Sequence, residues 1–233
     1  MLVAIGIDWQ GRRRIIGVEL ANRESATSWR EFLLGLKQRG LRGVRYGSPV
    51  HQPPLVPSSS SVVSDQHEGL RRAVGEVLSE AAWQRCYVHF LRNAFDYLPR
   101  KNAEDCLMEL RWLYDRRDVN EARADLGVWL EKWSGKHPKL CAWVEENIEA
   151  TWTFYRLPRE HHKHMKSTNM LERLNQEVKR RTHVIRIFPN EASCLRLIRA
   201  LASETDDEWL DGACYLSMEA LREQSKIQLP MAA

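Results

Sequence analysis

The stretch from Ser167 to Asn190, STNMLERLNQEVKRRTHVIRIFPN, constrains the chain most, because it combines a helical apolar pattern with dense charge. Its apolar residues recur at helical spacing and form one stripe: Met170, Leu171, Leu174 and Val178. Asn169 and Glu172 have the spacing of a capping box, so we expect a helix that begins at Asn169.

The same stretch carries a polar face and a basic cluster. The polar face comprises Glu172, Asn175, Gln176 and Lys179. The basic cluster comprises Lys179, Arg180, Arg181, His183 and Arg186. An acid beside many cations suits an enzyme that handles a polyanion, because cations hold phosphates and a carboxylate can hold a metal ion. The alternative is an ordinary solvated basic face.

A second acid, Asp65, stands where a short strand that includes Val62 and Val63 meets a helix. Asp65 and Glu68 have N-cap to N3 spacing, so Asp65 can be read as a helix cap. It can also be read as a metal-binding carboxylate at the carboxyl end of a strand, where open α/β sheets place their active sites. Reasoning from the residues alone favours the cap.

The stretch from Trp83 to Val88 is expected to be a strand that enters a helix with His89. The spacing Cys86-x2-His89 could form half of a zinc site, but no second pair stands at a suitable spacing. Three histidines farther along the chain could approach in space: His161, His162 and His164.

The rest of the chain reads as strands and helices around one irregular stretch. Leu2 to Ile7 and Arg14 to Leu20 predict a hairpin, and Asp8 reads as its turn residue. Ser28 and Glu31 form a second capping box for a helix that stops at Gly40. Residues 46–61, rich in Pro and Ser, read as a disordered loop.

The second half of the chain is predicted to be helical. Every strong period from Asn93 to about Lys163 is helical, Asn190 is expected to cap a further helix, and Glu208 to Glu223 reads as one more.

Composition bounds the class of protein. The 233 residues are 43% hydrophobic and 28% charged, which is typical of a soluble globular chain. The net charge of +4 is only mildly basic, so the case for nucleic acid rests on how the cations cluster. Five widely spaced cysteines predict reduced thiols in a cytosol. No apolar run approaches the roughly 18 residues of a membrane span, and the N-terminus has no signal-peptide pattern.

Two long motifs in the same order resemble the Mutator-type (IS256-like) bacterial transposases. One is NMLERLNQEVKRRTHVIRIFPN, and the other is Asp-x3-Gly-Leu from Asp65 followed by Gln-Arg-Cys-x2-His ending at His89. The resemblance covers nearly the whole chain outside residues 46–61. It implies an α/β fold with an RNase H-like core. That core would be incomplete, because its first strand is missing, and an all-α insertion would interrupt it.

The resemblance also implies a division into domains. Residues 1–92 would be the N-terminal part of the core, 93–164 the all-α insertion, 165–204 the C-terminal helical part of the core with the third acid, and 205–233 a C-terminal helix and tail.

By the same resemblance, the chain would bind DNA and carry out metal-dependent phosphodiester cleavage and strand transfer. Asp65 would be the second metal-binding catalytic acid and Glu172 the third, around two Mg²⁺ (or Mn²⁺) ions. Glu177 competes with Glu172, but its spacing to Arg173 and Arg181 predicts an ion pair instead. Cys86, His89 and Asn175 are motif positions whose role stays open. The residues expected to bind DNA are Arg173, Lys179, Arg180, Arg181 and Arg186.

The family's first acid falls before Met1, so we expect this copy to be N-terminally truncated and weakly active or inactive. The expected partners are double-stranded DNA, both terminal inverted repeats and target, and further copies of the chain when it is full length, with no membrane. The expected location is the bacterial cytoplasm, at the nucleoid. The alternatives are a non-catalytic DNA-binding remnant that modulates a full-length transposase and a helical scaffold without a nucleic-acid role.

Overall fold

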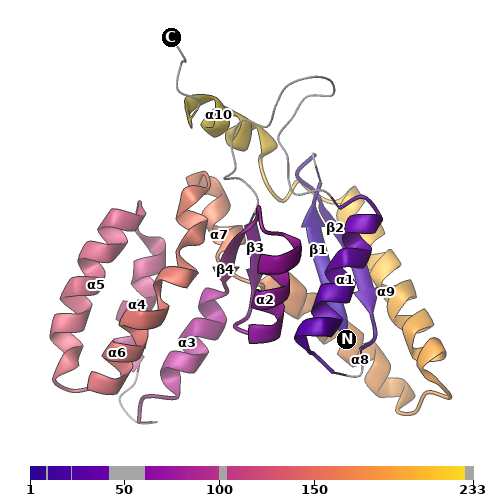
Figure 1. Ribbon diagram of the computed structural model, residues 1–233, viewed down its shortest axis with the longest axis horizontal. Coiled ribbons are helices and arrows are strands. Elements are labelled where there is room, and N and C mark those ends of the chain that lie inside the picture. Colours follow the sequence, from indigo (N-terminus) through magenta and orange to yellow (C-terminus); the bar gives the residue numbers. More distant parts are fainter. Residues whose placement is uncertain (9, 22, 42–60, 100–103, 229–233) are drawn as a thin grey trace. The chain divides into compact units, whose positions relative to one another are not determined.

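The computed structural model describes all residues except 9, 22, 42–60, 100–103 and 229–233, so the predicted loop at 46–61 lies outside the described residues apart from Ser61. The described residues form helices and two small sheets, an α/β composition (Figure 1). They divide into two compact units. Unit 1 contains residues 1–60, 67–81 and 168–233, and unit 2 contains residues 61–66 and 82–167.

Unit 1 begins with the predicted hairpin, which is confirmed as β1 (Leu2–Ile7) paired antiparallel with β2 (Arg13–Glu19). Asp8 is its turn residue, as expected, because its Oδ1 atom accepts hydrogen bonds from the backbone N–H groups of Gln10 and Arg12. The Asp8 side chain therefore stabilises its own turn by accepting backbone hydrogen bonds.

A bulge decides which side chains of the hairpin reach the core. The register shifts between Ala4 and Ile5, so β2 contributes one extra residue at that point. Ile15 and Val18 therefore face the same side, although a strict alternation would separate them. Both pack against the cluster formed by Leu174, Val178 and Ile198, which are helical residues.

Helices cover both faces of this hairpin. Helix α8 (Asn169–Ile185) and helix α9 (Glu191–Asp211) supply the cluster on one face. Helix α1 (Ala26–Gln38) packs against β2 from the other (Figure 1). A Cβ atom at Gly17 would lie 2.8 Å from Leu36, so the absence of a side chain lets α1 approach closely.

Helix α1 begins earlier than the sequence predicted. Its N-cap is Ser25, whose hydroxyl accepts from the backbone N–H of Ser28, so the capping box of Ser28 and Glu31 is wrong. The physical reason is a competing hydroxyl one turn upstream. The stop at Gly40 is confirmed, since its φ of +98° takes the left-handed conformation of a helix end.

The C-terminal helices also differ from the prediction. Asn190 caps α9 with a full capping box to Ser193, as predicted. The separate helix from Glu208 to Glu223 is wrong, because α9 continues to Asp211 and α10 spans Met218–Gln228. Contacts with the hairpin hold the last turns of α9: Asp206 pairs with Arg14 at 3.0 Å.

Unit 2 begins with two parallel strands, β3 (Ser61–Ser64) and β4 (Ala82–Arg85). Helices follow, as their apolar spacing predicted: α3 (Tyr87–Phe95), α4 (Glu104–Trp112), α5 (Val119–Ser134), α6 (Pro138–Asn147) and α7 (His162–Met165). Short 3-10 turns join α6 to α7.

One apolar core holds these helices together. Phe90, Leu110, Leu140 and Phe154 are completely buried there, and Trp129 and Trp133 pack beside them. All five cysteines are free thiols, as predicted. Across the described part of the chain, the structure contains no helix with the length and apolarity needed to cross a membrane.

Candidate active site and nucleic-acid interface

Asp65 follows directly on the end of β3, and its side chain is exposed. The hydroxyl of Ser64 donates to the Asp65 carbonyl oxygen at 2.8 Å, and the indole N–H of Trp83 donates to the Ser64 oxygen at 2.9 Å. These bonds hold the Asp65 backbone at the carboxyl edge of the parallel pair. That edge is where open α/β sheets place functional side chains.

Asp65 is not a helix cap, so the interpretation favoured by the residues alone is wrong. Helix α2 (Glu68–Val77) begins later, and His67 is its N-cap. The Nδ1 atom of His67 accepts from the backbone N–H of Leu70 at 3.2 Å. Because the imidazole takes the capping role, the Asp65 carboxylate has no part in starting α2.

Cys86 lies beside this edge of the sheet. It directly follows β4, and its backbone N–H donates to the Ser64 carbonyl oxygen at 2.7 Å. Its thiol is buried and it stands at the N-cap of α3, while His89 is half-buried one turn farther on. No group of three or more His, Cys, Asp or Glu side chains among the described residues is placed to hold a metal ion.

The three downstream histidines have separate local surroundings. His161 is buried, and the Nε2 atom of His162 lies 2.9 Å from the Leu157 carbonyl oxygen. Burial lowers the pKa of His162 below its ordinary value. His162 therefore packs as a neutral imidazole rather than as part of a cationic patch.

Gln84 is the first residue of the Gln-Arg-Cys-x2-His motif, and the sequence does not indicate its role. It is completely buried. Its Nε2 atom donates to the Thr151 carbonyl oxygen at 2.7 Å, and its Oε1 atom accepts from the backbone N–H of Phe154 at 2.9 Å. Gln84 therefore ties β4 to the 3-10 turns that follow α6. Its only signal in the sequence is an amide side chain near the end of a short strand.

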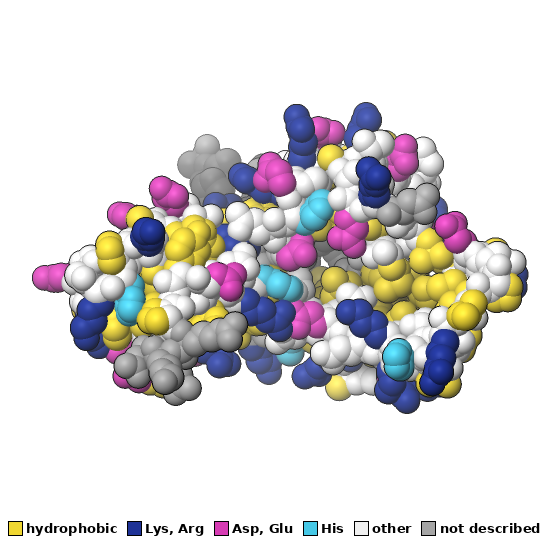
Figure 2. Space-filling view, turned by 90° about the horizontal axis from the view of Figure 1, so that it is seen from below, with side chains coloured by type: hydrophobic (Ala, Val, Ile, Leu, Met, Phe, Trp, Pro, Cys, Tyr) yellow, Lys and Arg dark blue, Asp and Glu magenta, His cyan; other side chains and the backbone are white. Residues whose placement is uncertain are grey.

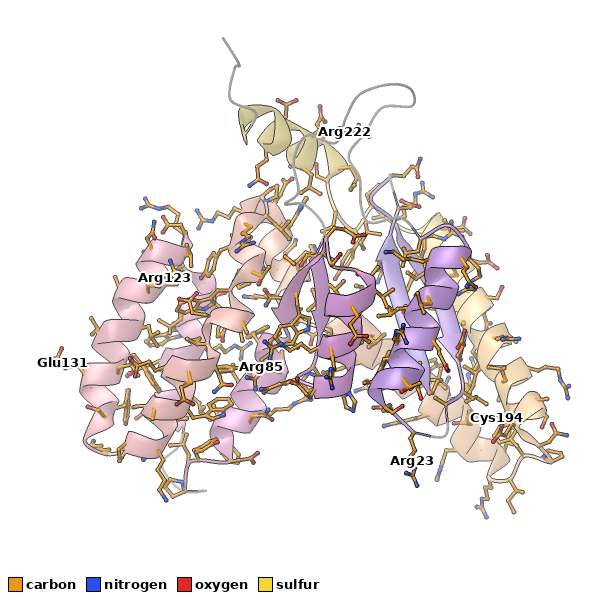
Figure 3. All side chains as sticks on the ribbon, viewed as in Figure 1. Arg23, Arg85, Arg123, Glu131, Cys194 and Arg222 are labelled. Atoms are coloured by element: carbon orange, nitrogen blue, oxygen red, sulfur yellow. The ribbon has the colours of Figure 1, made fainter. Side chains whose placement is uncertain are left out.

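Arg85 is also buried, which no sequence pattern indicated. Its guanidinium carbon lies 5.0 Å from the ring centre of Phe90 and 5.2 Å from that of Trp143. Figure 3 labels Arg85 among the side chains of unit 2. Its Nη1 atom donates to Asn147 at 3.4 Å, and no carboxylate among the described residues pairs with it. Burial lowers its pKa. Arg85 consequently supports α3 and α6 from inside unit 2 and is not a surface cation.

Glu172 lies in the first turn of α8, half-buried. The N-cap is Thr168, whose side chain does not cap the helix, so the predicted capping box of Asn169 and Glu172 is wrong. Asn169 is already the first helical residue, which places its side chain out of capping position. A carboxylate at this end of a helix is favoured by the helix dipole. Asn175, three residues on, lies on the same face.

Glu177 forms the structural ion pair that was predicted, with one change of partner. Its Oε1 atom lies 2.7 Å from Arg180 and 2.9 Å from Arg181, whereas the prediction paired it with Arg173 and Arg181. Hydrogen bonds from Arg180 and then Arg181 lower the pKa of Glu177 to about 2. The Glu177 carboxylate is therefore already paired with two arginines of its own helix, so Glu172 is the better candidate for a metal-binding carboxylate.

The predicted DNA-binding cations lie in or directly after α8 and are all exposed: Arg173, Lys179, Arg180, Arg181 and Arg186. Figure 2 shows a face of the molecule on which Lys and Arg side chains stand beside a gathering of hydrophobic side chains. Glu177 offsets part of this charge through its two ion pairs. The remaining cations leave a positive surface suited to phosphates. Glu172 belongs to unit 1 and Asp65 to unit 2.

A family model described as "Transposase, Mutator family" matches residues 1–212. The chain belongs to the Mutator family of transposases. This agrees with the resemblance seen in the two motifs.

Three curated Mutator-type relatives extend the match. The chain is 60% identical, over its whole length, to the transposase of insertion sequence ISRM5 from Rhizobium meliloti, of which it covers 55%. It is 38% identical over 93% of its length to the IS406 transposase of Burkholderia multivorans, covering 52% of that protein. It is 37% identical over 89% of its length to the IS256 transposase of Staphylococcus aureus, covering 50%. The chain thus spans about half the length of these relatives.

Proposed function

We propose that this Mutator-family chain carries catalytic carboxylates of a transposase that binds double-stranded DNA and breaks and joins its phosphodiester bonds. The proposal rests above all on Asp65, an exposed carboxylate just beyond the carboxyl end of β3 that neither caps a helix nor binds its own turn. Open α/β sheets place their ligand-binding side chains at the carboxyl ends of strands, which is where Asp65 lies.

The proposed fold of the catalytic core is RNase H-like, with the helices of unit 2 inserted into it. The antiparallel pair β1–β2 and the parallel pair β3–β4 support this proposal. Among the described strands, β1 pairs only with β2, and β3 pairs only with β4. Each pair thus keeps an open edge at which a further strand of such a sheet could bond.

In this proposal Asp65 and Glu172 hold divalent cations, Mg²⁺ or Mn²⁺. Their carboxylate oxygens are the hard ligands that these ions prefer. When bound, such ions lower the pKa of water and offset the negative charge that develops on the phosphate. The exposed cations of α8 hold the DNA backbone, and Glu177 offsets part of their charge through its ion pairs with Arg180 and Arg181.

A second candidate function is DNA binding without cutting, through which the chain would modulate a full-length transposase. The observation that favours it is the exposed basic surface of α8, which is complete whether or not a metal ion binds. Salt-dependent binding is expected in both cases, because each phosphate contact releases counterions.

Cleavage of a plasmid that carries both ends of the element separates the two candidates. The catalytic proposal predicts Mg²⁺-dependent cutting that Glu172→Gln abolishes while duplex binding persists. Glu177→Gln, a matched change on the same helix, is expected to leave cutting intact. Replacing Arg180 and Arg181 together by Glu is expected to impair binding most. Binding without cutting by the unaltered chain would favour the second candidate.

Localised oxidation tests the carboxylates independently of turnover. Fe²⁺ bound in place of Mg²⁺, with ascorbate and peroxide, produces hydroxyl radicals that cut nearby backbone. We expect fragments that end close to Asp65 and close to Glu172, suppressed by excess Mg²⁺ and lost in Asp65→Asn. An unchanged fragment pattern in Asp65→Asn and in Glu172→Gln would contradict the proposed metal site.

A further inference from the structure

The C-terminal end of α8 and the residues directly after it expose aliphatic side chains that the proposed chemistry does not use. Ile187 is 83% exposed and Val184 is 79% exposed, which are the highest values among the exposed large hydrophobic side chains of the described residues. Ile185, between them in the sequence, is 45% exposed. Single exposed aliphatic residues are ordinary on a protein surface, but here several lie within one short stretch.

The backbone next to Ile187 adopts a strained conformation. Arg186 has φ +61° and ψ −51°, and it is the one residue other than glycine with a positive φ among those that the structure describes. The backbone N–H of Ile187 donates to the Ile185 carbonyl oxygen at 2.7 Å, which closes a tight γ-turn. A turn of this type is rare and strained, and such strain is found at functional sites. Ile187 is the exposed residue that follows this turn.

Both ends of the segment are held by regular structure. Helix α8 ends at Ile185, with Val178 buried in the core of unit 1 two turns earlier. Helix α9 begins with the capping box of Asn190 and Ser193. A short loop between two packed helices presents its side chains with little loss of conformational entropy on binding.

The charges around the segment indicate what it contacts. Lys179, Arg181 and Arg186 lie at the same helix end and are exposed. Duplex DNA matches both the cations and the aliphatic side chains, because phosphates pair with the cations and an unstacked base step accepts an aliphatic side chain.

We propose that Ile187 inserts between base pairs of bound duplex DNA and kinks it, while the cations at the same helix end hold the flanking phosphates. This inference rests on the DNA binding proposed above and adds a positioning role for a residue without charge. A kink at the reacting base step would unstack two base pairs, which costs free energy. The contacts between the cations and the phosphates would offset that cost.

The test uses short duplexes that carry one end of the element, with 2-aminopurine replacing a single adenine at successive positions. The fluorescence of 2-aminopurine rises when its stacking is broken. We expect a several-fold rise at one step with the unaltered chain and most of that rise lost in Ile187→Ala. Duplex binding at low salt is expected to weaken only a few-fold, with an unchanged dependence on salt. Ile187→Met, which keeps an apolar side chain of similar volume, is expected to retain the signal.

Val128→Ala is the matched control, because Val128 is an exposed aliphatic residue on α5 at 66% exposure. It is expected to leave binding and fluorescence unchanged. Tight binding with no rise at any position, or a rise that survives Ile187→Ala, would overturn the insertion while leaving the proposed DNA binding intact. Loss of self-association in Ile187→Ala, with the rise unchanged, would assign the segment to contacts between copies instead. No duplex binding at all would overturn the DNA-binding function itself.

Discussion

Two glycines on α2 allow the packing of α1 against α2 to be tested with one kind of substitution. A Cβ atom at Gly69 would lie 2.8 Å from the backbone nitrogen of Ala26 and 3.2 Å from its Cα atom. A Cβ atom at Gly75 would have no atom within 4 Å. Because backbone atoms cannot rotate away, Gly69→Ala must push the two helices apart, whereas Gly75→Ala must not.

The two effects on stability can be separated. Alanine is favoured over glycine in a helix interior by about 1 kcal/mol, which Gly75→Ala gains, whereas Gly69→Ala gains less because Gly69 is the second residue of α2. Crowding of a packed interface costs roughly 1–3 kcal/mol, and only Gly69→Ala incurs it. We therefore expect Gly75→Ala to stabilise unit 1 by up to about 1 kcal/mol and Gly69→Ala to be less stable than Gly75→Ala by roughly 1–3 kcal/mol.

Urea unfolding followed by circular dichroism measures the free energy of unfolding of each variant. Hydrogen exchange of the α1 and α2 amides locates the change, with faster exchange expected in Gly69→Ala and slower exchange in Gly75→Ala. Equal stabilisation by both substitutions would refute the close approach of the two helices at Gly69.

Three further outcomes follow from individual contacts. Gln84→Leu leaves the buried backbone groups of Thr151 and Phe154 without partners, so unfolding in urea should show a loss of roughly 2–5 kcal/mol. Gln84→Glu should also destabilise, because it places a carboxylate oxygen against the Thr151 carbonyl oxygen in a completely buried site. The lowered pKa of His162 means that the unfolded chain takes up a proton first as pH falls below 6.5. Unfolding free energy should therefore fall with acidification over that range, and His162→Gln should remove that part of the pH dependence. Glu177→Gln removes a carboxylate from the basic surface, so duplex affinity at low salt should rise, and a lower affinity would contradict its place there.

Much of the fold was predictable because its signals are local. The hairpin, the turn at Asp8, the end of α1 at Gly40 and the cap of α9 at Asn190 each depend on a few neighbouring residues, and all four are confirmed. The ion pair of Glu177 was predictable for the same reason, since helical spacing brings charges together within one turn.

The predictions that failed involve competition between neighbours. Ser25 caps α1 in place of Ser28, and His67 caps α2 in place of Asp65. Each replaced residue has the right chemistry at the right spacing, so the sequence cannot rank the candidates. The entry angle of the chain decides which side chain reaches the free N–H groups, and the rest of the unit sets that angle.

The sequence by itself determined that α8 would be a helix with an apolar stripe, that Glu172 would stand in its first turn, and that exposed cations would follow. Those features depend on the 3.6-residue period and on charge, which are written into consecutive residues. Only the tertiary structure decided that Arg85 is buried while Ile187 is exposed, the reverse of what their chemistry suggests. Burial depends on which segments pack together: aromatic rings from α3 and α6 lie over Arg85, whereas the loop after α8 leaves Ile187 largely uncovered.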